Sequence, residues 1–132
     1  MKTRDIHQTI QFQTTALDVY CCLMDERIHS SFTGAKAVIS DSEGSSFSSY
    51  DGYAVGKNVV LERGKKIVQS WRTVDEQWPA THESEAAFIL SDTAEGCKLE
   101  FFHTGVPEAL ADRIERGWYE YYWEPLSFYL NR

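Results

Sequence analysis

His103 is the polar side chain in this sequence that is best placed to do chemistry. It ends the run from Cys97 to His103, in which alternation puts it on one face of a strand with Leu99 and Phe101. An imidazole titrates near neutral pH and can accept, donate or transfer a proton. No nucleophile or metal ligand stands in a spacing that completes a site with it, so a histidine satisfied by backbone or a tyrosine hydroxyl is the favoured interpretation.

Large aromatic residues from separate segments form the second candidate set. With His103 as one polar member, we expect the following residues to converge and line a cavity: Tyr53, Trp71, Phe88, Phe101, His103, Trp118, Tyr121 and Tyr122. Aromatic walls with a few hydroxyl groups are common in small-molecule sites. The same composition also fills ordinary cores, and the two interpretations stay open here.

Other kinds of site lack their motifs. The histidines show no HxH or HExxH spacing, and Cys21 and Cys22 are neighbours that point about 100° apart on a helix. There is no glycine-rich loop between a strand and a helix and no GxSxG sequence. We therefore expect no metal ion and no cofactor.

Charge narrows the class of partner. The 132 residues carry 13 Lys and Arg against 20 Asp and Glu, for a net charge of −7. Nucleic acid and anionic membranes require a basic footprint, so neither is expected as the main partner. The basic residues Arg63, Lys65 and Lys66 surround a predicted turn and are interpreted as solubilising charges.

Length and cysteine usage indicate one soluble cytoplasmic domain spanning residues 1–132. This length supplies one hydrophobic core and is too short for two. The three cysteines are odd in number and form no CxxC motif, which fits a reducing compartment. The first five residues lack the apolar core of a signal peptide, and no apolar run approaches the roughly 20 residues that span a bilayer.

Periodicity predicts a strand, two helices, a run of strands and a final helix. Residues 6–12 alternate as a half-buried strand; a helix follows Thr15, which with Asp18 forms a capping box, and a short helical segment over residues 25–33 ends at Gly34. The strands that follow are predicted over residues 37–40, 47–50, 53–61, 67–72, 83–90 and 97–103. Asp51-Gly52 predicts a two-residue hairpin turn, and Gly56 a bulge.

One long helix is predicted over residues 107–130. Its apolar stripe consists of Leu110, Ile114, Trp118, Tyr121, Tyr122, Pro125, Leu126 and Tyr129. We expect Trp118 to be buried against the sheet, with Gly117 permitting close approach. Pro125 cannot donate to the carbonyl of Tyr121, so the helix should loosen there and that carbonyl should find water or a side-chain donor.

Grouped strands with helices at either end describe an α+β domain. No connection among the strands from residue 37 to residue 103 is long enough for a crossover helix, so the sheet should be antiparallel. The terminal helix is the remaining element with enough apolar surface to cover it. We therefore expect a strongly curved antiparallel sheet wrapped around the long C-terminal helix.

Several spaced motifs resemble one family over residues 34–130. They are Ser70-Trp71-Arg72, Trp78-Pro79, the run from Gly96 to Phe101, Gly105-Val106-Pro107, Gly117-Trp118, Tyr121-Tyr122 and Pro125-Leu126. Together they are similar to the C-terminal domain of the activator of the ninety-kilodalton heat-shock chaperone's ATPase and to small proteins that share that domain. The resemblance implies the helix-grip fold of the START-like (SRPBCC) superfamily, which includes lipid-transfer domains, pollen-allergen-like proteins and polyketide cyclases.

Three functions follow as hypotheses. The first is a non-enzymatic domain that binds an apolar or amphipathic small molecule between the sheet and the terminal helix. The second, which the resemblance implies, is a chaperone-associated interaction protein that modulates the heat-shock chaperone's ATPase. The third is a cyclase-like or hydrolase-like enzyme that uses the cavity, although the sequence names no acid–base pair for it.

Overall fold

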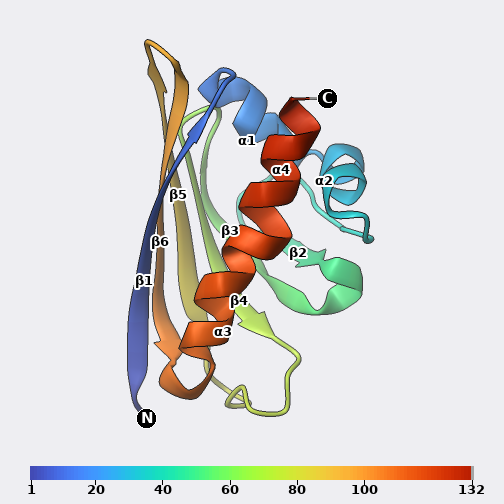
Figure 1. The fold of residues 1–132 in the computed structure, drawn as a ribbon. Coiled ribbons are helices and arrows are strands. Elements are labelled where there is room, and N and C mark those ends of the chain that lie inside the picture. The colour runs from blue at the N-terminus through green and yellow to red at the C-terminus, as the bar shows by residue number, and fades with distance from the viewer. Residues whose placement is uncertain (132) are drawn as a thin grey trace.

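Within residues 1–131, six strands form one antiparallel sheet that the C-terminal helix crosses on its concave face (Figure 1). The computed structural model describes residues 1–131, and its strands are β1 (Thr3–Phe12), β2 (Ser46–Ser49), β3 (Ala54–Glu62), β4 (Lys66–Thr73), β5 (Ser84–Thr93) and β6 (Gly96–Pro107). Their order is β1-β6-β5-β4-β3-β2, and every neighbouring pair is antiparallel. The predicted α+β helix-grip architecture is confirmed.

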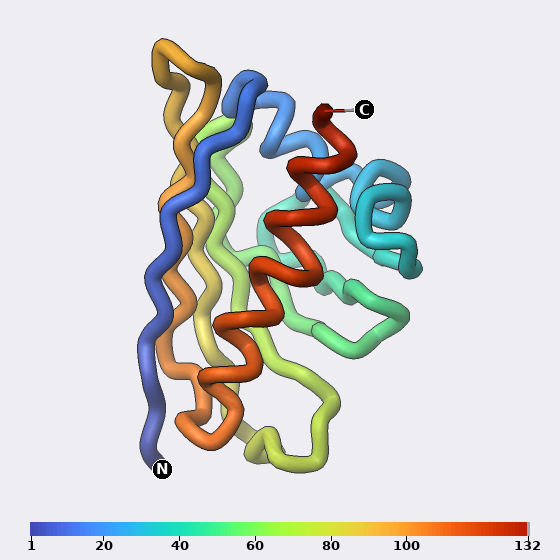
Figure 2. Tube along the Cα trace, viewed as in Figure 1, coloured from blue at the N-terminus to red at the C-terminus, as the bar shows by residue number. Residues whose placement is uncertain are grey.

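Two α-helices lie between β1 and β2, and the remaining α- and π-helical segments follow β6. They are α1 (Ala16–Met24), α2 (Glu26–Thr33), α3 (Glu108–Trp118), the π-helix η2 (Tyr119–Trp123) and α4 (Glu124–Leu130). The last three run on without a break, so the predicted long terminal helix is confirmed. In Figure 2 this helix runs diagonally across the sheet, and α1 and α2 lie near its C-terminal end.

The two short helices begin and end where the sequence predicted. The Thr15 side chain accepts from the backbone N–H of Asp18 at the start of α1. Asp25 caps α2 by accepting from two backbone N–H groups, and Gly34, with φ of 75°, ends that helix. These caps set the start of α1 and both ends of α2, the two helices that connect β1 to β2.

The predicted two-residue turn at Asp51-Gly52 is wrong. Ser49 pairs with Ala54, so four residues connect β2 to β3, and the first three form a short 3₁₀ turn, η1 (Tyr50–Gly52). Tyr50 and Asp51 have positive φ values of 51° and 58°. Asp51 exchanges hydrogen bonds with the backbone of Lys36, and these contacts hold the wider turn against the segment that precedes β2.

Two further strand details differ from expectation. Residues 37–40 form no strand and contribute only an isolated bridge between Val38 and Ser48. The bulge in β3 lies between Asn58 and Val60 rather than at Gly56. Gly56 is needed for another reason, because a Cβ there would lie 1.8 Å from the carbonyl oxygen of Ser70 on β4.

The terminal helix widens where Pro125 was expected to loosen it. The N–H of Glu124 bonds to the carbonyl of Tyr119, five residues back, and the Tyr50 hydroxyl donates to the carbonyl of Tyr121. Both the loosening and the side-chain donor are as predicted. The additional residue rotates the following side chains by about 100°, so Trp123, absent from the predicted stripe, is buried while Tyr121 is 52% exposed.

Candidate functional site

His103 lies at the centre of a sealed polar chain. Its side chain is fully buried; Trp118 Nε1 donates to His103 Nδ1 at 3.0 Å, and Nε2 lies 2.7 Å from Ser84 Oγ. Because an indole only donates, Nδ1 accepts, so the neutral ring carries its proton on Nε2 and donates to Ser84. Ser84 in turn donates to the carbonyl of Trp71 at 2.8 Å. Burial lowers the pKa of His103 to about 3.

These hydrogen bonds give His103 a structural role. A serine beside an imidazole resembles a nucleophile with its base, but both side chains are buried and each already has its partners. Neither residue lines the cleft, the second hollow or the small void described below. Both side chains are shielded from solvent, and the geometry offers no support for hydrolytic chemistry there.

A second buried histidine was not singled out by the sequence analysis. His29 Nδ1 lies 2.9 Å from the carbonyl of Leu23, and Nε2 lies 3.0 Å from the Tyr122 hydroxyl. Since a carbonyl only accepts, Nδ1 must donate, so the tyrosine hydroxyl donates to Nε2. Burial lowers the pKa of His29 and raises that of Tyr122. These bonds tie the terminal helix to α2.

A third polar contact joins the helix to the edge strand β1. Trp123 Nε1 donates to Gln8 Oε1 at 2.7 Å, and Gln8 Nε2 donates to the carbonyl of Glu115 at 2.8 Å. The alternation of residues 6–12 places Gln8 on the inward face of the strand, but no sequence pattern announces its partners. All three networks share one feature: each bonds the terminal helix to another element.

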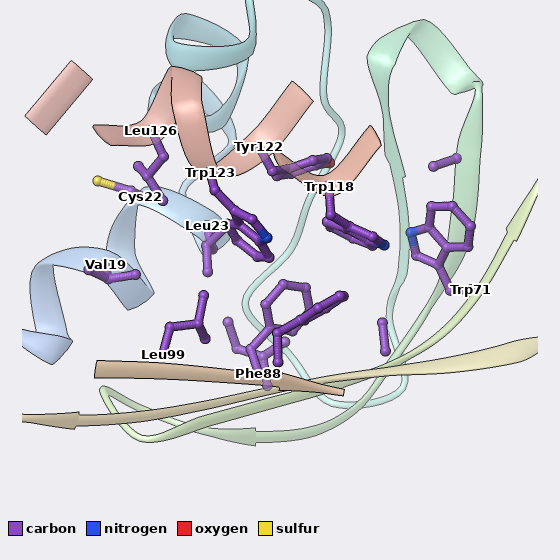
Figure 3. Close-up of a cluster of buried hydrophobic side chains, with 14 of the residues drawn as sticks. Val19, Cys22, Leu23, Trp71, Phe88, Leu99, Trp118, Tyr122, Trp123 and Leu126 are labelled. Atoms are coloured by element: carbon purple, nitrogen blue, oxygen red, sulfur yellow. The ribbon is translucent and has the colours of Figure 1, made fainter. Parts of the chain in front are cut away.

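Aromatic rings fill the space between the helix and strands β5 and β6. The Phe101 and Trp118 ring centroids are 4.5 Å apart, and Trp118 and Trp123 stack at 5.6 Å with an interplanar angle of 19°. Figure 3 shows Trp118 and Trp123 extending from the helix toward the sheet, with Tyr122 lying beside the helix and Phe88 close to the strands. A void of about 20 Å³, which is room for roughly one water, remains under the helix; Phe88, Trp118 and Tyr122 border it, whereas Phe101 and Trp123 do not.

An open cleft lies beside this packed region, between the helix and the start of β3. It has a volume of about 610 Å³. Five of the eight predicted site residues line it: Tyr53, Trp71, Trp118, Tyr121 and Tyr122. Phe88 borders the small interior void, and Phe101 and His103 border neither space. The remaining lining residues are Tyr50, Ala54, Asp75, Arg113, Ile114, Arg116, Gly117 and Glu120.

Two contacts bound the cleft at either end of the helix segment that borders it. At one end Arg113 Nη2 lies 2.6 Å from Asp75 Oδ2, which ties residues 74–83 to α3. At the other end the Tyr50 hydroxyl bonds to the carbonyl of Tyr121. Arg113, Gly117 and Tyr121 follow at four-residue spacing, so the glycine lies between the two contacts.

Gly117 keeps the cleft open rather than bringing the helix close to the sheet. A Cβ at this position would have the Tyr121 ring as its nearest neighbour, at 3.6 Å, which is an ordinary contact. The expectation that its missing side chain permits a close approach is therefore wrong. The absent side chain instead leaves the wall of the cleft bare.

A second hollow of about 670 Å³ lies over the start of α1 and the β3–β4 turn. Its lining includes the basic residues Arg63, Lys65 and Lys66 and contains no aromatic residue. The Cα and side chain of Leu17 pack beside Gly64 there. Although this hollow is slightly larger, it offers no aromatic ring against which a flat apolar ligand could stack.

Two further classes of site were searched for among residues 1–131. No group of three or more His, Cys, Asp or Glu side chains could hold a metal ion. No helix in the same residues combines the length and apolar character needed to cross a bilayer.

The sequence model of one family, described as "Activator of Hsp90 ATPase homolog 1-like protein", matches residues 13–131. The chain belongs to this family. A Dictyostelium discoideum protein named "Activator of 90 kDa heat shock protein ATPase homolog" is 30% identical over 88% of the chain, and an uncharacterized Schizosaccharomyces pombe protein is 29% identical over 96%. The chain spans only 30% and 37% of the lengths of these two relatives.

Solved structures agree with the helix-grip architecture of this Hsp90 ATPase activator homolog family. A Plasmodium falciparum protein described as an HSP90 activator superimposes with a TM-score of 0.88 at 18% identity, covering 96% of both chains. Protein MLL2253 from Mesorhizobium loti gives 0.80 at 18% identity and covers 98% of both chains. At these identities the likeness shows the fold alone.

Proposed function

We propose that this domain is a non-enzymatic binding module that holds an apolar or amphipathic small molecule in the cleft beside the terminal helix. The aromatic cleft of about 610 Å³ carries this proposal. Its volume falls within the range of roughly 300–1,000 Å³ that small-molecule sites occupy. Rings from three separate parts of the chain converge on it, and Gly117 adds no side chain to its wall.

Apolar contact provides most of the binding free energy in this proposal. Trp71, Trp118 and Tyr122 form the wall nearest the packed interior, since all three border both the cleft and the small void. His103 acts from behind that wall, because its bond to Trp118 fixes the indole orientation. The polar orienting groups are then those of the cleft itself, rather than the imidazole.

A dye titration tests this proposal. The fluorescence of N-phenyl-1-naphthylamine, a neutral aromatic dye, should rise and saturate on binding to the wild-type protein. Gly117→Leu should abolish the rise, because the new side chain projects from the bare wall into the cleft. Glu124→Leu adds the same side chain to an exposed position outside the cleft and serves as the control. Equal dye binding by the Gly117→Leu variant would refute the proposal.

Modulation of a heat-shock chaperone is the second candidate. The printed names of the Dictyostelium and Plasmodium proteins support it, and so do two exposed aromatic side chains of the terminal helix, Tyr121 and Phe128, the latter 80% exposed. The test is the ATPase rate of the heat-shock chaperone from the same source, with and without the domain. An increase that Phe128→Ser removes would support this function, and an unchanged rate would reject it.

The cytoplasm is the proposed location. The three cysteines are odd in number and have no CxxC spacing, as expected of thiols kept in a reducing compartment.

Native mass spectrometry of protein purified from its source would reveal a small molecule retained in the cleft and give its mass.

A further inference from the structure

The charged residues of the cleft divide into one paired set and one unpaired set. Asp75 and Arg113 satisfy each other, and the second carboxylate oxygen of Asp75 accepts from the backbone N–H of Gln77. Arg116 and Glu120 also line the cleft, yet neither makes an ion pair with any of residues 1–131. The cleft therefore offers a ligand one unpaired cation and one unpaired anion.

The order of these two residues on the helix disfavours an ion pair between them. Arg116 precedes Glu120 by four residues, and the order of cation before anion is the weaker one for a helical ion pair. Asp112 lies one turn before Arg116 and is engaged at 2.6 Å by Arg4 from β1, so it does not neutralise Arg116 by direct contact. Both charged groups remain available at the edge of the aromatic cleft.

We propose that the cleft selects a small aromatic zwitterion, such as an aromatic α-amino acid. In this arrangement the ring of the ligand packs against Trp71, Trp118 and Tyr122, its carboxylate faces Arg116 and its ammonium group faces Glu120. Side chains four residues apart on a helix have Cβ atoms about 5–6 Å apart, so both can reach substituents of a single ligand carbon. This inference rests on the proposed function and adds the chemical class of the ligand.

A set of four matched compounds tests the two charges separately. The compounds are 2-naphthylalanine, which is zwitterionic; its N-acetyl derivative, which is anionic; its amide, which is cationic; and the N-acetyl amide, which is neutral. All four carry the same ring, so differences in their dissociation constants measured by calorimetry report the polar end alone. Exposed ion pairs are worth up to roughly fivefold each in binding, so the zwitterion should bind several-fold, and at most about 25-fold, more tightly than the neutral compound.

Two substitutions assign the charges to residues. Arg116→Gln should weaken the zwitterion and the anion and leave the cation and the neutral compound unchanged. Glu120→Gln should weaken the zwitterion and the cation only. Arg27→Gln on α2 and Glu124→Gln, one turn beyond Glu120, are exposed residues outside the cleft and should change nothing. The preference should diminish as salt is added, because these charges are solvated.

The outcomes separate this inference from the proposal on which it rests. If the neutral compound binds as tightly as the zwitterion and neither Arg116→Gln nor Glu120→Gln alters the ranking, selection of a zwitterion is refuted while the apolar cleft site stands. If the anion alone equals the zwitterion, the ammonium contact is refuted. If none of the four compounds and no naphthylamine dye binds, the proposed function itself fails.

Discussion

On the β5–β6 side of the terminal helix, aromatic rings fill the space down to the sheet, whereas on the β3 side the same helix borders an open cleft. Trp118 belongs to both regions: its ring packs on Phe101 and also lines the cleft. The interior void under the helix, which Phe88 and Trp118 border, measures about 20 Å³, whereas the open cleft measures about 610 Å³. Aromatic residues alone do not distinguish the two sides, because Phe and Trp rings fill the packed side and Tyr and Trp rings line the cleft.

The residues next to the aromatic rings determine whether the space on each side of the helix is packed or open. On the packed side each indole N–H has a buried acceptor, Trp118 on His103 and Trp123 on Gln8. On the open side the helix presents Gly117, and the contacts that Arg113 and Tyr121 make with the β4–β5 connection and η1 lie on either side of it. A ligand site in this fold therefore depends on a missing side chain and two bridging contacts as much as on aromatic residues.

Removing the Trp118 side chain should have the largest effect on stability. Trp118→Ala creates a cavity and leaves the buried Nδ1 of His103 without its donor, and comparable truncations cost about 3–5 kcal/mol. Urea unfolding measures the loss. Tyr119→Ala, next to it but 42% exposed, is the control and should change stability by no more than about 0.5 kcal/mol. Similar losses in the two variants would mean that the packed side is not packed.

The buried neutral imidazole should make stability fall in mild acid. The pKa of His103 is lowered from 6.5 to about 3, so between these values the unfolded chain binds a proton that the native state excludes. Stability should therefore decrease as pH falls through this window, by at most about 1.4 kcal/mol per pH unit. The difference between wild type and His103→Asn, measured by urea unfolding from pH 7 down to pH 5, isolates this contribution. Parallel profiles would contradict it.

Losing the hydroxyl at one end of the cleft should have a moderate effect. Tyr50→Phe leaves the carbonyl of Tyr121 without its donor and should cost about 1 kcal/mol, the usual net value of one hydrogen bond. Tyr53→Phe removes a hydroxyl that makes no hydrogen bond within residues 1–131 and should be neutral. Thermal unfolding of the two variants gives the comparison, and equal melting temperatures would show that the contact does not bound the cleft.

Adding a side-chain methyl group at Gly117, on the side of the helix that borders the cleft, should raise the free energy of unfolding slightly. Gly117→Ala adds a Cβ with only ordinary contacts in a helix interior, where alanine is favoured over glycine by up to about 1 kcal/mol. Denaturant midpoints measure the gain. Destabilisation would mean that the glycine serves packing after all, and that the open side is more crowded than the cleft implies.

Sequence pattern predicted the inward face of each element better than it predicted the space between them. Alternation placed Phe101 and His103 inward and helical periodicity placed Trp118 inward, and all three are buried. The position of Trp123 was missed because the π turn over residues 119–123 changes the helical phase, although Pro125 marked where the helix would loosen.

The candidate site was predicted in part for a related reason. The aromatic list contains five residues that line the cleft, but Phe88, Phe101 and His103 lie in or behind the packed side. Whether inward rings meet or leave a gap depends on pairs such as His103 with Trp118, which are 15 residues apart in sequence and joined only by the fold. No local pattern encodes such a pairing. A glycine at position 117 is equally compatible with an open cleft wall and with a close contact between helix and sheet, so the sequence did not decide between them.

Chemical-shift mapping tests the contrast between the two sides most directly. The isotope-labelled protein is titrated with N-phenyl-1-naphthylamine, and the shift of each backbone amide is followed. The largest changes should fall on Tyr53, Gly117 and Tyr121 around the cleft, with Leu99 and Phe101 on β6 nearly unmoved. Changes centred on β6, or the absence of any change at dye concentrations that saturate fluorescence, would contradict a packed interior with binding in the cleft.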